Sequence, residues 1–206
     1  MRRLIVGMTG ASGACYGVRL VELLARSGAE VHLIVTAAGR AVLAQEVAAA
    51  RGAADLVAAL WPDAAVRRLI RQHAPDDGAA PPASGSWRHD GMVVCPCSMN
   101  TLGAMAAGLA DNLLRRAAMA TLKERRPLVV VPRETPLATL MIENMLRLAQ
   151  AGAVVLPAMP GFYHRPRTVG DLVDFVAGRV LDVLSVEHDL AVRWPPDAPP
   201  SNTHPC

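Results

Sequence analysis

Residues 128–137 of the chain read Leu-Val-Val-Val-Pro-Arg-Glu-Thr-Pro-Leu. The three valines predict a strand that is buried on both faces of a parallel sheet, because such a run leaves no polar face for water. Pro132 ends the strand, and Arg133 and Glu134 follow at its carboxyl end, where open α/β sheets bind ligands. A cation that can hold phosphate beside a carboxyl group that can move a proton makes this a candidate site. The alternative is a solvated turn with two unrelated charges.

Strand and helix patterns alternate along the rest of the chain. Repeated β–α units of this kind build a doubly wound, mainly parallel sheet flanked by helices and joined by right-handed crossovers. We therefore expect an α/β protein with a single Rossmann-like domain over residues 1–188 and an extended, proline-rich C-terminal tail over residues 189–206. The patterns place strands at 4–8, 30–35, 91–95, 128–132 and 153–156, and helices at 14–26, 38–50, 53–73, 98–108, 112–124, 136–151 and 169–184.

Composition excludes several classes of protein. The net charge of +3 comes from scattered arginines, without a basic face that carries aromatic residues, so nucleic acid is not an expected partner. No apolar run approaches the roughly 20 residues that span a bilayer, so we expect no membrane association. The four cysteines lack metal-ligand spacing, and we therefore expect no metal, reduced thiols and a cytoplasmic location.

Lysine usage is unusual, because the chain has twenty arginines but a single lysine, Lys123. A general preference for arginine in the composition accounts for the twenty arginines but does not explain why one lysine remains. Lysine is a compact point charge whereas arginine is a planar fork, so a site that needs a point charge can require lysine. Lys123 is therefore a candidate site residue.

The segment Gly7-Met-Thr-Gly-Ala-Ser-Gly13 lies between the first predicted strand and the first helix, where backbone N–H groups can hold a phosphate. Its spacing is not the G-x-G-x-x-G of dinucleotide sites. The second strand ends in Val35-Thr36 and lacks the acidic residue that binds an adenosine ribose. These differences favour a mononucleotide such as FMN over NAD.

A second loop, Cys95-Pro-Cys-Ser-Met-Asn-Thr101, reaches the same edge of the predicted sheet. Ser98 is a suitable N-cap for the helix that follows, and an isolated serine of this kind often does nothing more. Two loops that favour anions at one sheet edge nevertheless make a shared ligand the better interpretation.

Seven stretches of the sequence, taken in chain order, resemble the flavin prenyltransferases, the UbiX-type members of the flavin-binding decarboxylase superfamily. The similarity extends from about residue 4 to residue 184. The stretches are Met8-Thr-Gly-Ala-Ser-Gly-Ala14, Pro81-Pro-Ala-Ser-Gly-Ser86, Cys95-Pro-Cys-Ser98, Ala110-Asp-Asn-Leu-Leu-Arg-Arg-Ala-Ala118, Leu122-Lys-Glu-Arg-Arg-Pro-Leu-Val-Val-Val-Pro-Arg-Glu134, Glu143-Asn-Met-Leu146 and Pro160-Gly-Phe-Tyr-His-Arg-Pro166.

The resemblance implies a metal-independent enzyme that transfers a dimethylallyl group from dimethylallyl phosphate to reduced FMN, with bonds to flavin N5 and C6. Residues 1–188 would form the FMN-binding domain. The prenylated FMN would pass to a UbiD-type decarboxylase. The family also forms large homo-oligomers, commonly dodecamers, whose active sites are shared between subunits.

The resemblance assigns roles to three sets of residues. Residues expected to contact FMN are Gly10, Ala11, Ser12, Thr36, Ser98, Met99, Asn100, Thr101 and Arg133. Residues expected to hold dimethylallyl phosphate are Lys123, Arg133, Tyr163 and Arg179, with Arg116 nearby. In catalysis Glu134 would be the acid/base residue, with Lys123 stabilising the leaving phosphate, Ser12 near flavin N5 and Glu46 in the hydrogen bonding around it.

One departure from the family concerns the prenyl group. Members can carry an aromatic residue just before the Pro-Pro-Ala-Ser-Gly-Ser loop, where this chain has Asp77-Gly-Ala-Ala80. Either the aromatic wall is weaker here, or Trp87, which follows the loop, replaces it.

Two other functions compete with prenyl transfer. An FMN-dependent decarboxylase of cysteine-derived carboxylates would carry a P-x-M-N-x-x-M-W motif, which this sequence lacks. An FMN-binding accessory subunit of a decarboxylase, without catalysis of its own, would not need the set of cationic residues around a leaving phosphate.

Overall fold

Six parallel strands form one sheet in the computed structural model, which describes residues 1–190. The order across the sheet is β3-β2-β1-β4-β5-β6, and every neighbouring pair is parallel. This confirms the predicted doubly wound α/β fold, and the order reverses between β1 and β4, where such sheets open a crevice for ligands. The strands are β1 (Arg3–Met8), β2 (Glu30–Val35), β3 (Ile70–His73), β4 (Gly91–Cys97), β5 (Leu128–Pro132) and β6 (Val154–Val155).

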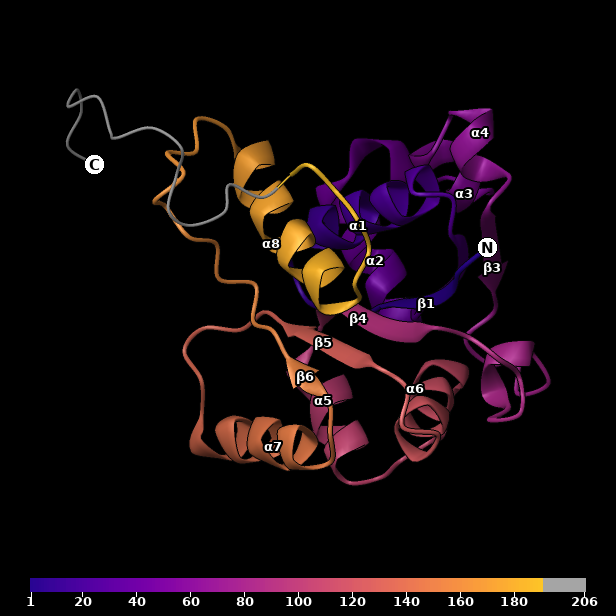
Figure 1. Cartoon of the computed structure of the whole chain (residues 1–206), viewed down its shortest axis with the longest axis vertical. Helices are drawn as coiled ribbons and strands as arrows, with labels where there is room; N and C mark the ends of the chain where they lie inside the picture. Colours follow the sequence, from indigo (N-terminus) through magenta and orange to yellow (C-terminus); the bar gives the residue numbers. More distant parts are fainter. Residues whose placement is uncertain (191–206) are drawn as a thin grey trace.

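Helices cover both faces of the sheet (Figure 1). One face carries α1 (Ala14–Arg26), α2 (Ala37–Glu46) and α8 (Val169–Val183), and the other carries α5 (Met99–Ala106), α6 (Leu113–Lys123) and α7 (Thr139–Gln150). The short helices η1 (Ala48–Ala50), α3 (Leu56–Leu60) and α4 (Ala64–Arg67) lead to β3, and η2 (Pro81–Ala83) precedes β4. No helix within residues 1–190 is long and apolar enough to cross a membrane.

Alternate residues of each strand enter two separate cores. In β1, Leu4, Val6 and Met8 pack in the core beneath α1 and α8, whereas Ile5 packs in the core beneath α5 and α6. Each large aliphatic side chain buried in this way contributes about 1.5–3 kcal/mol. Because helices and the two cores cover both faces of the sheet, a site is expected at the ends of the strands and not on the faces.

The predicted helix over residues 53–73 is wrong in its C-terminal part. Residues 70–73 form β3, an edge strand that pairs only with β2. Ile70 is its only buried residue, so β3 lacks the apolar run that marks a central strand.

Other boundaries differ by a few residues. The helix predicted over 38–50 ends at Glu46, and the helix predicted over 136–151 begins at Thr139. The domain boundary at residue 188 stays a prediction. The predicted tail lies outside the described residues from position 191 onward.

Gly7 provides a test of the packing between β1 and α6. A Cβ atom at Gly7 would lie 2.7 Å from Cδ1 of Leu114, which is fully buried in α6. Gly7→Ala should therefore overpack this core and lower the free energy of unfolding by about 1–3 kcal/mol. The double variant Gly7→Ala/Leu114→Ala should lose less unfolding free energy than the sum of the two single variants, because the added methyl group occupies the space that the leucine leaves. Urea denaturation measures these differences.

The control is Gly78→Ala, since a Cβ atom at Gly78 meets no atom within 4 Å. Equal losses in the two glycine variants would contradict the packing argument.

Candidate active site

One buried hydroxyl joins the loops that follow β1 and β4. Oγ1 of Thr9, a residue only 2% exposed, donates to the carbonyl oxygen of Pro96 at 2.8 Å and accepts from the N–H of Ser98 at 2.7 Å. The N–H of Thr9 donates to the same Pro96 oxygen at 3.2 Å. The two loops singled out in the sequence therefore meet at one edge of the sheet.

Ser98 is the N-cap of α5, as predicted. Its Oγ accepts from the N–H of Thr101 at 3.3 Å and donates to Oγ1 of Thr101 at 3.1 Å. Met99 and Thr101 are buried, whereas Asn100 is exposed. The first turn of α5 is thus fixed at the sheet edge, where its remaining N–H groups favour an anionic or strongly polar ligand.

Two charged side chains fix the loop after β1. Nε of Arg133 donates to the carbonyl oxygen of Ser12 at 3.0 Å, and Oε2 of Glu46 accepts from the N–H groups of Gly13 and Ala14 at 2.9 Å each. Burial acts to raise the pKa of Glu46, but hydrogen bonds from Ser12, Ala14 and Gly13 and the charge of Arg133 lower it overall. Glu46 is therefore an anion that stabilises the N-terminus of α1.

Glu134 stands beside Arg133 at the end of β5. Its carboxyl group is exposed, and Oε1 accepts from the N–H of Thr135 at 3.1 Å. The N–H of Arg133 donates to the carbonyl oxygen of Cys97 at 3.4 Å, which ties the end of β5 to that of β4. An accessible carboxyl group beside a fixed guanidinium group can exchange a proton with an anionic ligand.

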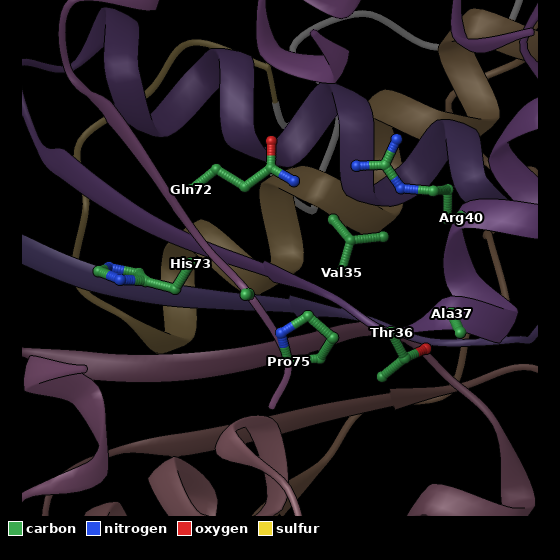
Figure 2. A pocket seen from close by; sticks show the side chains of 8 residues that line it. Val35, Thr36, Ala37, Arg40, Gln72, His73 and Pro75 are labelled. Carbon is green, nitrogen blue, oxygen red and sulfur yellow. The ribbon is translucent and has the colours of Figure 1, made fainter. Parts of the chain in front are cut away.

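A cavity of about 470 Å³ opens beside Thr36, at the carboxyl ends of β2 and β3. Thr36 caps α2, because its Oγ1 accepts from the N–H of Gly39 at 3.0 Å. Figure 2 shows Arg40, Gln72 and His73 around this cavity. Sequence reasoning missed these three residues: β3 had no strand signal to place Gln72 and His73 at the edge, and nothing distinguished Arg40 from other surface arginines.

A second cavity, of about 390 Å³, lies between α6 and the loop around η2. Arg116 and Lys123 line it together with Ser84, Gly85 and Met119. Arg116 and Lys123 therefore lie along one face of α6, and their contact with dimethylallyl phosphate stays a prediction.

The second cavity extends away from the carboxyl ends of the strands. The N–H of Leu113 donates to the carbonyl oxygen of Pro75, which lines the first cavity, so α6 begins near that edge. The helix then runs back toward the start of β5 for eleven residues, about 16 Å at 1.5 Å per residue. Lys123 at its C-terminal end is therefore far from Arg133 of the same chain.

Tyr163 and Arg179 form a third group, beside α8. The ring of Tyr163 packs edge-on against Phe175, with ring centroids 5.8 Å apart. Arg179 lies one turn further along the helix, and its Nη1 is 2.7 Å from Oδ2 of Asp182. The structure thus brings the residues around Ser12, Ser98 and Arg133 together and places Arg116 with Lys123 in the second cavity. Tyr163 lies beside Phe175 of α8, the helix that also carries Arg179.

Trp87 is not among the residues that line the second cavity, and its replacement of the missing aromatic residue stays a prediction. Its ring packs edge-on against His32, with ring centroids 4.6 Å apart, stacks on His89, and has the guanidinium carbon of Arg3 5.2 Å above it. The apolar side of the cavity comes instead from Met119 and alanines. Within residues 1–190, no three histidine, cysteine or acidic side chains are grouped to hold a metal ion.

A parallel sheet of this strand order, with a glycine-containing loop after its first strand and a capped helix after its fourth, defines a nucleotide-binding α/β protein. The family model described as Flavoprotein matches residues 1–181. The chain is 49% identical over 190 residues to the flavin prenyltransferase UbiX of Halalkalibacterium halodurans, a match that covers 92% of this chain and 91% of that protein. It therefore belongs to the flavoprotein family, within the flavin prenyltransferases of the UbiX type.

Solved structures agree with this family. A dodecameric FMN-dependent UbiX-like decarboxylase from Escherichia coli O157:H7 is 44% identical, with a TM-score of 0.83 over 93% of this chain and 98% of that one. AnUbiX (PadA1), in complex with FMN and dimethylallyl pyrophosphate, is 41% identical, with a TM-score of 0.79 over 90% of this chain and 93% of that one.

The bridge made by Thr9 can be tested by removing its hydroxyl group. Thr9→Val keeps the shape of the side chain but leaves the partly buried N–H of Ser98 without its acceptor and the buried carbonyl of Pro96 without one donor, which should cost about 1–3 kcal/mol of unfolding free energy. Thr9→Ser keeps the hydroxyl and should recover most of this loss. Equal destabilisation by the two changes, measured by urea denaturation, would show that the methyl group matters instead.

Glu46 should make stability depend on pH. Because its pKa is lowered in the folded protein, its carboxylate stabilises the fold above the unfolded pKa, and this contribution is lost as the pH falls through the folded pKa. At pH 7, Glu46→Gln should lower the unfolding free energy by about 0.3–1 kcal/mol. The gap between the two proteins should close in acid, and a gap that stays constant with pH would contradict the charge effect.

Proposed function

We propose that this protein transfers the dimethylallyl group of dimethylallyl phosphate to reduced FMN. The prenyl C–O bond breaks and phosphate leaves as a bond forms to flavin N5, which loses its proton. A second bond then forms between C6 and the prenyl alkene, which gains a proton at its other carbon while C6 loses the ring proton. The observation that carries the proposal is the meeting of the Gly10–Ser12 loop, the capped start of α5 and Arg133 at one sheet edge, in a chain that belongs to the UbiX-type family.

The residues at this edge fit FMN. The N-terminus of α5 and Asn100 offer hydrogen-bond donors to the polar edge of a flavin, and Arg133 offers a cation held in place by Ser12. The cavity beside Thr36 and Arg40 suits the ribityl phosphate chain, because it combines hydroxyl, amide and guanidinium groups. We assign Gly10 and Ala11 to the loop that would contact FMN, and Ser12 with Glu46 would fix the hydrogen bonding near N5.

The donor phosphate needs fixed positive charge, since cleavage of the allylic C–O bond leaves negative charge on it. We assign this role to Lys123, Arg133, Tyr163 and Arg179, with Arg116 nearby. Lys123 lies far from Arg133 in one chain, so we propose that a homo-oligomer of twelve subunits, the number in the neighbour from Escherichia coli O157:H7, assembles each site from several copies. Exposed Leu140, Ile142 and Leu146 on α7 support such contacts.

Glu134 is the proposed acid/base residue, because it is the carboxyl group next to Arg133. It would protonate the departing phosphate or accept the proton lost from the flavin ring. The product, prenylated FMN, would then serve a UbiD-type decarboxylase. We place this activity in the cytoplasm, on a domain that ends near residue 188, and the free thiols of Cys15, Cys95 and Cys97 support a reducing compartment.

Mass spectrometry of the flavin after anaerobic incubation with reduced FMN and dimethylallyl phosphate tests the proposal. The wild-type protein should add one C5 unit to FMN. Glu134→Gln should bind FMN normally but form product about 10²–10⁴-fold more slowly, as expected for loss of a general acid/base. The control is Glu187→Gln, which removes another exposed carboxylate and should not alter the rate.

Two outcomes would contradict this function. FMN that is bound but unmodified with both the monophosphate and the diphosphate donor would exclude prenyl transfer. Full activation of a partner decarboxylase by Glu134→Gln would favour an accessory FMN-binding subunit.

A further inference from the structure

We infer that Arg126 is a positioning residue for the donor phosphate, because it holds residues 84–87 against the end of α6 and so confines the ammonium group of Lys123. The inference rests on the proposed function, which assigns the phosphate to Lys123. Arg126 acts through Gly85 and Trp87 and is not itself assigned to either ligand.

Gly85 lies directly against the lysine side chain. A Cβ atom at Gly85 would lie 2.7 Å from Nζ and 3.0 Å from Cε of Lys123, and 2.5 Å from Oε1 of Glu124. A Cβ atom here would displace the ends of both side chains, so the bare backbone of Gly85 is what lets the ammonium group lie in this place. The loop therefore forms a wall on one side of the ammonium group.

Lys123 has little else to hold it. Its side chain is 64% exposed, and its ion pair with the neighbouring Glu124, at 3.0 Å, is exposed as well. Exposed pairs of this kind restrain a long side chain only weakly. A phosphate that binds Lys123 must therefore immobilise a flexible side chain, unless the wall at Gly85 has already limited its conformations.

Arg126 fixes this wall to α6. Its Nη2 donates to the carbonyl oxygen of Gly85 at 2.9 Å, and its Nη1 donates to that of Trp87 at 2.8 Å. Its own N–H donates to the carbonyl oxygen of Thr121 at 3.0 Å, inside the last turn of α6. One guanidinium fork thus joins the loop to the helix that carries Lys123, and a lysine at this position has no fork to hold two carbonyl groups in fixed geometry.

Trp87 holds the other end of the loop on the sheet. Its ring packs against His32, His89 and Arg3, which come from β2, the segment before β4, and β1. With Trp87 fixed in this way, the two bonds from Arg126 determine how closely Gly85 approaches Lys123.

Because Lys123 is the only lysine, its reaction with an amine reagent can be followed without interference from other lysines. We would measure acetylation of Lys123 by acetic anhydride, with peptide mass spectrometry, over a range of inorganic phosphate concentrations. In Arg126→Gln the phosphate concentration that gives half protection should rise about three- to tenfold, the range expected when a side chain must be immobilised on binding. Arg126→Lys can keep one of the two bonds and should lie between this variant and the wild type.

The matched control is Arg125→Gln, which removes the adjacent, exposed arginine and should leave protection unchanged. Gly85→Ala, which leaves Arg126 intact, should weaken protection in the same direction as Arg126→Gln. In steady-state assays the KM for dimethylallyl phosphate should rise in Arg126→Gln with kcat little changed, and FMN affinity should stay the same.

Protection equal to the wild type in both Arg126→Gln and Gly85→Ala would overturn the inference. Equal losses of FMN affinity and of phosphate protection in Arg126→Gln would also overturn it, because they would indicate a general loss of structure. A wild-type protein whose Lys123 is not protected by phosphate at all would instead contradict the assignment of Lys123 in the proposed function.

Discussion

The hydroxyl group of Thr9 is the interaction on which the candidate active site depends. β1 and β4 are neighbours at the point where the strand order reverses, and there the loops that follow them must diverge to opposite faces. Thr9 holds these loops together with one donated and one accepted hydrogen bond, out of contact with water. The start of α5 and the loop before α1 are therefore held next to each other at the carboxyl ends of the strands. Arg133 and Glu46 also hold the loop before α1, through hydrogen bonds with Ser12 and Ala14.

The same topology separates the cations that a leaving phosphate would require. A right-handed crossover returns α6 antiparallel to the strands, which carries Lys123 away from the edge where Arg133 stands. The proposed function brings such residues to one substrate through another copy of the chain. The exposed apolar side chains of α7 suit the contacts that this assembly needs.

Sequence reasoning succeeded where local chemistry determines structure and failed where tertiary packing does. The valines of β5, the loop after β1 and the cap at Ser98 all carry their own signals, and the structure has them as predicted. β3 carries no such signal, because this edge strand has only one buried residue. Gln72 and His73 were therefore not predicted to lie near the site. The wall formed by Gly85 was equally hidden, since its partner Arg126 is distant in the chain and resembles any arginine at the end of a helix.

Arginine and lysine have different tasks in this molecule, which gives the composition a physical meaning. Arg126 donates to two carbonyl groups, and Arg19 donates to both carboxylate oxygens of Asp174. Both arrangements depend on a planar guanidinium group with several donors. Lys123 has a different setting, an exposed position in a cavity against a glycine backbone. Its compact ammonium group lies beside this backbone, at the position where the proposed function places a point charge.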